Sequence, residues 1–317
     1  MCGIAGRILR QPGNIGAELV SVMQAMRHRG WDSTGFALYG SMRSDSYVAR
    51  ALVDDRSELG STLDDVIELT REHHADVLAD PTWDLTDQLH VTIRFEISEP
   101  VDLRRWIDAC DALPLLELQS VGRSLEIIKD VGDALEVAEK HDITAFQGTH
   151  GLGHVRLATE SLVSPVAGHP FWARPFPDVA IVHNGQLTNY YTWRRRLQRA
   201  GYRFTTENDS ELIAVWNSVQ MAAGRSLEES LGQSRIDLDG VFTYLLATST
   251  HLGMAKDRFA IKALAAVDDV DGVVIATEEQ ALRTLHPNEV DVVNFDGPSM
   301  VRTWDAVAGH SLVGLAP

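Results

Sequence analysis

The spacing of apolar side chains along the chain predicts short strands mixed with amphipathic helices. His90 to Ile97 alternates strictly between apolar and polar residues, as expected for a strand that is buried on one face. Leu19, Val22, Met23 and Met26 recur at helical spacing, which predicts one buried helix face. Further strands are expected over 2–9, 35–39, 125–129, 153–159, 179–183, 241–248, 254–256, 263–267, 273–277, 290–295 and 299–304, and further helices over 59–79, 103–110, 133–141, 187–200, 210–221 and 278–285. This mixture places the chain in the α+β class.

The character of the sequence changes between residues 44 and 146, where polar helical stretches accompany the alternating strand. The simplest interpretation is an α+β subdomain, 44–146, inserted between two pieces of a larger domain, 1–43 and 147–317. In that larger domain, strand hairpins are frequent and the helices occur in a few pairs. This pattern is typical of stacked antiparallel sheets with helices on their outer faces.

Composition and charge narrow the function classes. The 317 residues include 28 Lys and Arg against 45 Asp and Glu, a formal charge of −17, which excludes nucleic-acid binding through the overall field. Two cysteines cannot form the disulfide framework of a small secreted protein, and no apolar run approaches the ~20 residues of a membrane helix. The chain begins without a signal-peptide pattern. We therefore expect a cytoplasmic protein without a membrane partner.

The cysteine that follows the initiator methionine is the sharpest chemical feature. Removal of Met1 would leave a thiol and a free α-amine on Cys2, with ordinary pKa values of about 8.5 and about 7.7–8.0, so the nucleophile would carry its own base. The alternative is a small buried residue on the first strand. If Met1 is retained, Cys2 has a peptide nitrogen and that base does not exist. The sequence leaves this point open.

Six segments of the chain resemble motifs of the class II glutamine amidotransferases, and they occur in the same order as in that family. They are CGIAG at 2–6, RHRGWDS at 27–33, GHVRLAT at 153–159, HPF at 169–171, HNGQLTN at 183–189 and NDSE at 208–211. The similarity covers about 1–40 and 150–285. The resemblance implies a four-layer αββα N-terminal-nucleophile hydrolase fold that hydrolyses the side-chain amide of L-glutamine and passes the ammonia on.

The resemblance also assigns catalytic roles. Cys2 would attack the amide carbon and form a glutamyl thioester. The side chain of Asn184 and the backbone N–H of Gly185 would receive the developing oxyanion, which needs neutral donors aimed at its oxygen. We expect a turn at this dipeptide, because Asn-Gly is also a strong hairpin-turn pair.

The substrate-binding residues follow from the same matches. Arg156 would hold the α-carboxylate of glutamine and Asp209 its α-ammonium, so that one fixed cation and one fixed anion select a free amino acid. Arg29 and Gly30 would close the pocket beside the nucleophile, and Thr159 belongs to the same set. Each has an ordinary alternative: Arg156 could be a surface strand residue, and Asp209 is well placed as a helix N-cap.

Some positions depart from the family pattern. Leu157 stands where relatives often have an aromatic residue, and Glu160 where some have histidine, so we expect the wall of the pocket to differ. The segment 256–264 lacks the proline and glycine of the family's R-D-P-x-G-x-R-P-L element. This difference weakens any inference about a partner site there.

The recognisable core and the insertion together occupy nearly the whole chain, which predicts that the ammonia acceptor is in a separate synthase subunit. The insertion and segment 122–130 most resemble stand-alone glutamate-synthase-type glutaminase subunits, such as the amidotransferase subunit of N-methylglutamate synthase. This resemblance implies no cofactor in this chain and allows FMN and an iron–sulfur cluster in a partner subunit. Two alternatives are an N-terminal-cysteine hydrolase of another amide and a non-catalytic scaffold subunit with the same fold.

Other constellations are weaker. His73 and His74 lie on a polar helix, and His150 and His154 lack the helical spacing of a zinc site, so we predict no metal site. No glycine-rich phosphate-binding motif occurs. The arginines over 194–199 are typical of a solvated helix face, with docking to an acidic partner as the alternative.

Overall fold

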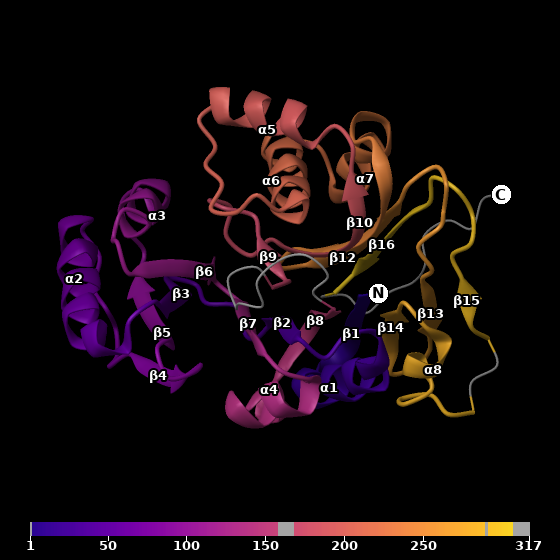
Figure 1. The fold of residues 1–317 in the computed structure, drawn as a ribbon, viewed down its shortest axis with the longest axis horizontal. Coiled ribbons are helices and arrows are strands. Elements are labelled where there is room, and N and C mark those ends of the chain that lie inside the picture. The colour runs from indigo at the N-terminus through magenta and orange to yellow at the C-terminus, as the bar shows by residue number, and fades with distance from the viewer. Residues whose placement is uncertain (1, 158–167, 289–290, 307–317) are drawn as a thin grey trace.

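The computed structural model describes residues 2–157, 168–288 and 291–306 (Figure 1). Within these residues the strands form three antiparallel sheets. The largest has seven strands in the spatial order β15 (Val293–Asn294), β13 (Ala265–Asp268), β14 (Gly272–Ala276), β1 (Gly3–Gly13), β8 (Gly148–Arg156), β2 (Ser33–Tyr39) and β7 (Leu125–Val131). Because β1 pairs with β14 on one side and with β8 on the other, the first described residues enter the interior of the sheet.

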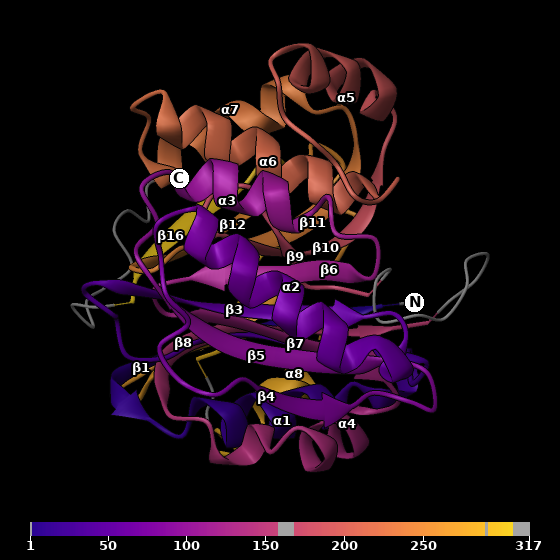
Figure 2. The ribbon, with the colours of Figure 1, turned by 90° about the vertical axis from the view of Figure 1, so that its left-hand side faces the viewer.

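The second sheet has five strands in the order β16 (Val301–Asp305), β12 (His251–Lys256), β11 (Gly240–Ala247), β10 (Ala180–Leu187) and β9 (Phe171–Trp172). One of its faces packs on the seven-stranded sheet. Val182 of β10 and Leu245 of β11 belong to the same buried cluster as Ile4 of β1 and Leu152 of β8. Figure 2 shows the two sheets stacked.

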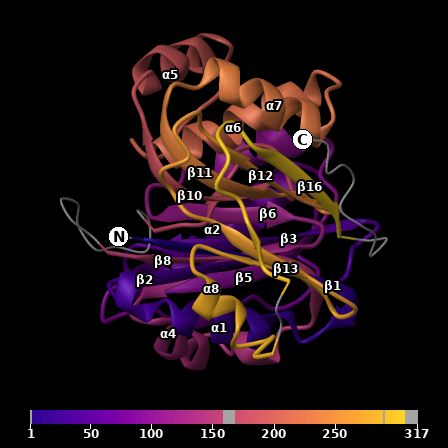
Figure 3. The same cartoon turned by 90° about the vertical axis from the view of Figure 1, so that its right-hand side faces the viewer.

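Helices cover the outer faces of both large sheets (Figures 2 and 3). On the seven-stranded sheet these are α1 (Ile15–Ala25), α4 (Ala134–Lys140) and α8 (Glu279–Leu282); α6 (Asp209–Ala222) and α7 (Leu227–Asp237) pack on the five-stranded sheet, with α5 (Tyr190–Arg199) beside α6. The predicted buried face of α1 is confirmed, because Leu19, Val22 and Met23 are buried against Ala5 and Val155. None of the helices within the described ranges has the length and apolar character needed to cross a membrane.

A third sheet lies within residues 46–122. Its four strands are ordered β4 (Thr82–Leu85), β5 (Val91–Ser98), β3 (Ser46–Val53) and β6 (Leu116–Gly122), and it carries η2 (Arg56–Glu58), α2 (Leu59–Glu72) and α3 (Leu103–Cys110). The alternation predicted for β5 is confirmed, since its four apolar residues are buried. The next strand, β7, pairs with β2 of the seven-stranded sheet. The sheets thus divide the chain after Gly122, while the domain division at 44–146 stays a prediction.

Strand β3 and helix α7 are among the elements that the sequence pattern did not predict. All eight residues of β3 are buried, so this strand lies between two covered faces and shows no alternation of apolar and polar positions. In α7, Leu227 and Leu231 are buried together with Ser230 and Ser234. Because two of its four core-facing positions are serines, the helix has almost no apolar stripe for the sequence to reveal.

Two histidines of β8 are buried. The ring of His150 stacks on Tyr39 with 4.1 Å between ring centroids, and its Nε2 lies 2.8 Å from the carbonyl oxygen of Thr248. The ring of His154 stacks on His169 at 4.1 Å. Burial lowers the pKa of His150 to about 4, and burial together with the charge of nearby Arg156 lowers the pKa of His154 to about 3. Both rings are therefore neutral at pH 7.

These neutral histidines predict a loss of stability in mild acid. An unfolded chain protonates a histidine below about pH 6.5, whereas folded His150 is protonated only near pH 4. The free energy of unfolding should therefore fall, by about 1.4 kcal/mol per pH unit for each histidine, as the pH decreases from about 6.5 to about 5. Urea unfolding across this range measures the slope. His150→Gln should reduce it, and an unchanged slope in that variant would contradict the assignment.

Candidate active site

Cys2 lies immediately before β1, at a point where three segments distant in sequence meet. Its carbonyl oxygen accepts a hydrogen bond from Nε of Arg29 at 3.0 Å and another from Nδ2 of Asn184 at 3.2 Å. Arg29 belongs to η1 (Arg27–Arg29), and Asn184 belongs to β10. Cys2 is partly exposed, so a molecule in solution can reach it. Met1, whose removal would free the amine of Cys2, lies outside the described residues.

The ladder between β1 and β8 brings Arg156 to the same end of the sheet as Cys2. Gly3 stands opposite Val155, and antiparallel strands run in opposite directions, so Cys2 and Arg156 are the next residues beyond this pair. Because side chains alternate along a strand, both lie on the face that carries Ile4. That face is turned toward the five-stranded sheet.

Gly30 holds η1 against the end of β8. A Cβ at this position would lie 2.3 Å from the carbonyl carbon of Arg156 and 2.5 Å from the backbone nitrogen of Leu157, so only glycine permits the approach. The neighbouring Arg29 is fixed by an ion pair with Glu278 as well as by its bond to the Cys2 carbonyl. Arg29 and Gly30 therefore lie beside both Cys2 and the backbone of Arg156.

Asn184 and Gly185 lie within β10, where they pair with Thr243 and Phe242 of β11. The expectation of a turn at this dipeptide is wrong, because the strand continues to Leu187. The glycine serves a close approach of two strands instead: its φ is 146°, and a Cβ there would lie 2.0 Å from the carbonyl oxygen of Val241.

The side-chain amide of Asn184 is held at the start of β1. Besides its bond to the Cys2 carbonyl, Nδ2 lies 3.5 Å from Oγ1 of Thr277, which in turn accepts a hydrogen bond from the backbone N–H of Ile4 at 2.9 Å. Oδ1 of Asn184 is buried and has no hydrogen-bond partner among the described residues. The donor of this amide therefore lies next to Cys2 and is itself held by the surrounding structure.

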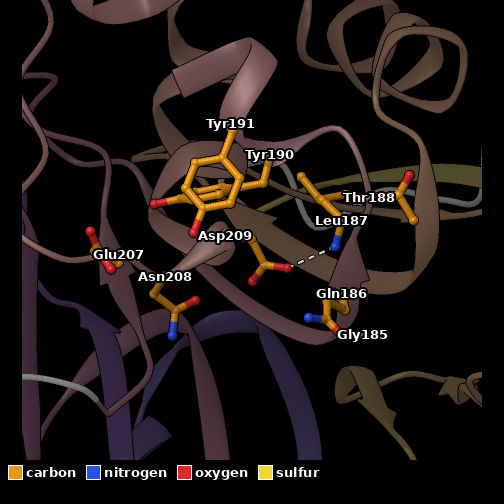
Figure 4. A pocket seen from close by; sticks show the side chains of 9 residues that line it. All are labelled: Gly185, Gln186, Leu187, Thr188, Tyr190, Tyr191, Glu207, Asn208 and Asp209. Atoms are coloured by element: carbon orange, nitrogen blue, oxygen red, sulfur yellow. Dashed lines mark hydrogen bonds between the residues drawn. The ribbon is translucent and has the colours of Figure 1, made fainter. Parts of the chain in front are cut away.

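Asp209 is the first residue of α6. The N-cap is Asn208, whose side chain accepts from the backbone N–H of Ser210 at 2.9 Å, so the cap role considered for Asp209 belongs to its neighbour. Oδ2 of Asp209 accepts the backbone N–H of Leu187 at 2.8 Å (Figure 4), and Oδ1 lies 3.6 Å from Nδ1 of His183. Burial raises the pKa of Asp209, but the interactions with His183, Leu187 and Ser210 outweigh it and leave a lowered pKa. The carboxylate is therefore ionised at neutral pH.

A cleft of about 390 Å³ opens at the end of β10 and the start of α6 (Figure 4). Its lining consists of Gly185, Gln186, Leu187, Thr188, Tyr190, Tyr191, Glu207, Asn208 and Asp209. Two predicted site residues, Gly185 and Asp209, thus share one cavity. Cys2 and Arg156 are not part of its lining, and Thr159 falls outside the described residues.

Sequence reasoning missed a buried cluster of His169, His183 and Ser210. Oγ of Ser210 lies 2.7 Å from Nε2 of His169 and 2.9 Å from Nδ1 of His183. Burial is the main cause that lowers the pKa of His169 well below its usual value. Both histidines and the serine stand inside the recognised segments HPF, HNGQLTN and NDSE. Since His183 precedes Asn184 and Ser210 follows Asp209, the cluster ties the strand of one to the helix of the other.

Within the described ranges, no three or more His, Cys, Asp or Glu side chains are grouped so that they could hold a metal ion.

Comparison with known proteins adds independent findings. The family model of the glutamine amidotransferase domain matches residues 154–284. A protein of Methanothermobacter thermautotrophicus, assigned by name as a glutamine amidotransferase, is 34% identical over 311 residues, which are 96% of this chain and 100% of that protein. The glutamine amidotransferase-like protein GlxB of Rhizobium meliloti is 32% identical over 311 residues, 96% of this chain and 98% of that protein.

A solved structure shares the fold. The glutamine phosphoribosylpyrophosphate amidotransferase of Bacillus subtilis superposes with a TM-score of 0.58 at 18% identity, over 96% of this chain and 47% of that chain. The present chain thus spans about half the length of that protein. At this level of identity the likeness concerns the mixed α/β fold alone.

Proposed function

This chain belongs to the glutamine amidotransferase family, and from that premise we propose that it is the glutaminase subunit of a multi-subunit amidotransferase. It hydrolyses the side-chain amide of L-glutamine to glutamate and ammonia, and the ammonia passes to a partner synthase subunit. One observation carries the proposal: Arg29 and Asn184 both donate hydrogen bonds to the carbonyl oxygen of Cys2. Two of the family's separate segments therefore converge on the nucleophile.

In the proposed reaction, Sγ of Cys2 attacks the amide carbon of glutamine. The α-amine of Cys2, free once Met1 is removed, takes the thiol proton and delivers a proton to the leaving ammonia. Water then hydrolyses the thioester to glutamate. The side chain of Asn184 and the backbone N–H of Gly185 donate to the oxyanion in both steps. The position of the Asn184 amide at Cys2 supports this role.

The proposed substrate clamp uses one cation and one anion. Arg156 binds the α-carboxylate and Asp209 the α-ammonium of glutamine, while Arg29, Gly30 and Thr159 close the pocket. The lowered pKa of Asp209 supports its part, because an ionised carboxylate at neutral pH attracts an ammonium group. The cleft that it lines has room for a small amino acid.

We extend the proposal to the four-layer αββα arrangement of N-terminal-nucleophile hydrolases. Three buried clusters support it: one lies between the two large sheets, one beneath α1 and α4, and one beneath α6 and α7. Each layer boundary of the proposed arrangement thus has its own apolar core.

The proposed complex is of the glutamate-synthase or N-methylglutamate-synthase type. In the two relatives compared, the matched region covers 98–100% of the protein, which leaves no room in them for a synthase domain. By analogy, the acceptor chemistry belongs to a partner subunit. FMN and an iron–sulfur cluster would be bound by that partner subunit, and this chain would hold no cofactor.

Asp209→Asn tests the clamp and the reaction together. We expect the KM for glutamine to rise about tenfold to a hundredfold, because a charged hydrogen bond contributes about 1.5–3 kcal/mol, while kcat changes little. The measurement is glutamate release by the purified chain with Met1 removed. Asp64→Asn, on the exposed face of α2, is the control with the same charge change.

The outcomes separate the hypotheses. An unchanged KM would remove Asp209 from the clamp. No glutamate release by the processed parent chain would argue for a non-catalytic scaffold, and faster release of ammonia from a different amide would argue for another hydrolase.

A further inference from the structure

Helix α5 carries an uncompensated positive charge. Its sequence YYTWRRRLQR contains four arginines and no acidic residue. Arg195, Arg196 and Arg199 are exposed. In the part of the chain that the structure describes, none of these four guanidinium groups lies within 4.0 Å of a carboxylate oxygen; Arg195 donates to a backbone carbonyl, and Arg196 lies over the ring of Trp193. Such a concentration is unusual on a chain with a formal charge of −17.

Helix stability explains only part of this charge. Arg196 and Arg199 stand in the last turn, where a cation interacts favourably with the helix dipole by about 0.3–1 kcal/mol. Arg195 gains nothing from the dipole at that position. It also stands four residues before Arg199, and like charges at this spacing destabilise a helix by about 0.2–0.5 kcal/mol. The cluster is therefore not what folding alone would select.

The positive charge continues onto α3. Nη2 of Arg104 donates to the carbonyl oxygen of Gly201 at 2.7 Å, just beyond the end of α5, and its guanidinium lies 5.3 Å from the ring centroid of Tyr202. Arg203 lies 3.8 Å from Asp108 of α3, and Arg105 pairs with the N-cap Asp102 at 3.4 Å. We call the exposed residues Arg104, Arg105, Arg195, Arg196, Arg199 and Arg203 the α5–α3 basic surface.

This surface is continuous with the cleft of Figure 4. Tyr190 and Tyr191, the first two residues of α5, line the cleft. Nε of Arg195 donates to the carbonyl oxygen of Tyr191 at 3.2 Å. A helix of ten residues is only about 15 Å long, so a molecule that covers the arginines also borders the cleft that Asp209 lines.

We infer that the α5–α3 basic surface docks an acidic face of a separate polypeptide, which thereby comes to lie against the cleft. This inference rests on the proposed function, since the polypeptide that needs this position is the synthase subunit that receives the ammonia. The surface has an excess of positive charge: among the described ion pairs, Asp102 and Asp108 are the carboxylate partners of its six exposed guanidinium groups, while Glu207 and Asp209 lie at its border, in the cleft. The carboxylates of an acidic patch on a protein partner can pair with these arginines without contacting the rest of this chain.

A nucleic acid fits the same charges less well. Its phosphates extend far beyond one patch, and the remainder of this chain carries the excess of 45 Asp and Glu over 28 Lys and Arg. A local acidic patch on a protein avoids that repulsion, because salt screens charges beyond about 10 Å. The geometry therefore favours an acidic polypeptide.

The test uses fluorescein-labelled poly-L-glutamate as the probe and the full chain as its receptor, and binding is followed by anisotropy at about 0.1 M salt, where charges beyond about 10 Å are screened. The variant Arg195→Gln/Arg199→Gln/Arg203→Gln removes three charges of the surface. The control Arg56→Gln/Arg71→Gln/Arg225→Gln removes three exposed arginines elsewhere. We expect the first variant to raise the Kd for poly-L-glutamate about tenfold, as the loss of three exposed ion pairs implies, and the control to stay within about twofold of the parent.

Glutaminase activity and folding, measured by circular dichroism, are followed in the same samples and should be unchanged in both variants. Equal weakening by the two variants would overturn the inference, because binding would then follow net charge alone. Tighter binding of a duplex DNA oligonucleotide than of poly-L-glutamate would also overturn it. If the parent chain shows no glutaminase activity but binds poly-L-glutamate selectively, that result would count against the proposed function. The inference that the α5–α3 basic surface docks an acidic polypeptide would still hold.

Discussion

Replacement of Cys2 by alanine is expected to abolish glutamine hydrolysis by a folded protein. The proposed reaction forms its covalent bond on Sγ of Cys2, and loss of the nucleophile in enzymes of this kind lowers kcat by at least about 10³-fold. Coupled detection of glutamate measures the effect. Because Cys2 precedes β1 and its carbonyl oxygen makes the observed hydrogen bonds, alanine keeps those backbone contacts.

Cys110 provides the matched control. It is the only other cysteine of the chain, and it is buried on α3, where desolvation raises the pKa of its thiol well above the usual value. Since the thiolate is the reactive form, iodoacetamide should label Cys2 and not Cys110, and Cys110→Ala should retain hydrolysis. In the assembled complex, Cys2→Ala should keep ammonia-dependent synthesis. Equal loss of the glutamine-dependent and ammonia-dependent reactions would contradict separate half-reactions.

Strands were predicted from the sequence either by alternation or by a continuous apolar run; β2 and β14 are of the second kind and are buried along their whole length. Strand β5 has one covered face, so its alternation predicted it correctly. Helix α6 was predicted from the polar residues before it, and Asn208 does cap it. Strand β3 is also buried throughout, but Ser46 and Arg50 interrupt its apolar residues, so it shows neither strict alternation nor a continuous apolar run.

The residues of the candidate site were also predicted only in part. The ordered segments predicted that the regions of Cys2, Arg29 and Asn184 belong together, and the structure brings these three residues into contact. Local reasoning failed for Asn184–Gly185, because the turn preference of this dipeptide is overridden by the close approach of Val241 in the neighbouring strand. Such an approach depends on tertiary packing, which no local pattern records.

The Ser210 cluster could not be derived from spacing either. His169, His183 and Ser210 come from three separate segments, and each is an ordinary polar residue where it stands. Only the packing of α6 against β10 brings the hydroxyl between the two rings. Its consequence is positional: the N-terminus of α6 holds the strand that carries Asn184 through Ser210 on His183 and through Asp209 on Leu187.

Because the strand that carries Asn184 is held in this way, we expect a large loss of activity when the Asn184 side chain is removed. Asn184→Ala should lower kcat about 10²-fold to 10³-fold, the usual consequence of losing one oxyanion donor, with little change in KM. A neutral donor that is already held in place lowers the barrier without reorganising during the reaction, and Nδ2 of Asn184 is held at the Cys2 carbonyl and near Thr277. Steady-state kinetics with glutamine give both constants.

Asn184→Asp tests whether the hydrogen-bond donor of the side chain matters or only the shape of the side chain. Aspartate has the same outline as asparagine but offers only acceptors, so at neutral pH it should be at least as inactive as Asn184→Ala if donation to the oxyanion is what matters. Thermal unfolding of both variants shows whether the lost bond to the Cys2 carbonyl also loosens the start of β1. A raised KM with an unchanged kcat would identify Asn184 as a ground-state binding residue and transfer the oxyanion to the backbone N–H of Gly185.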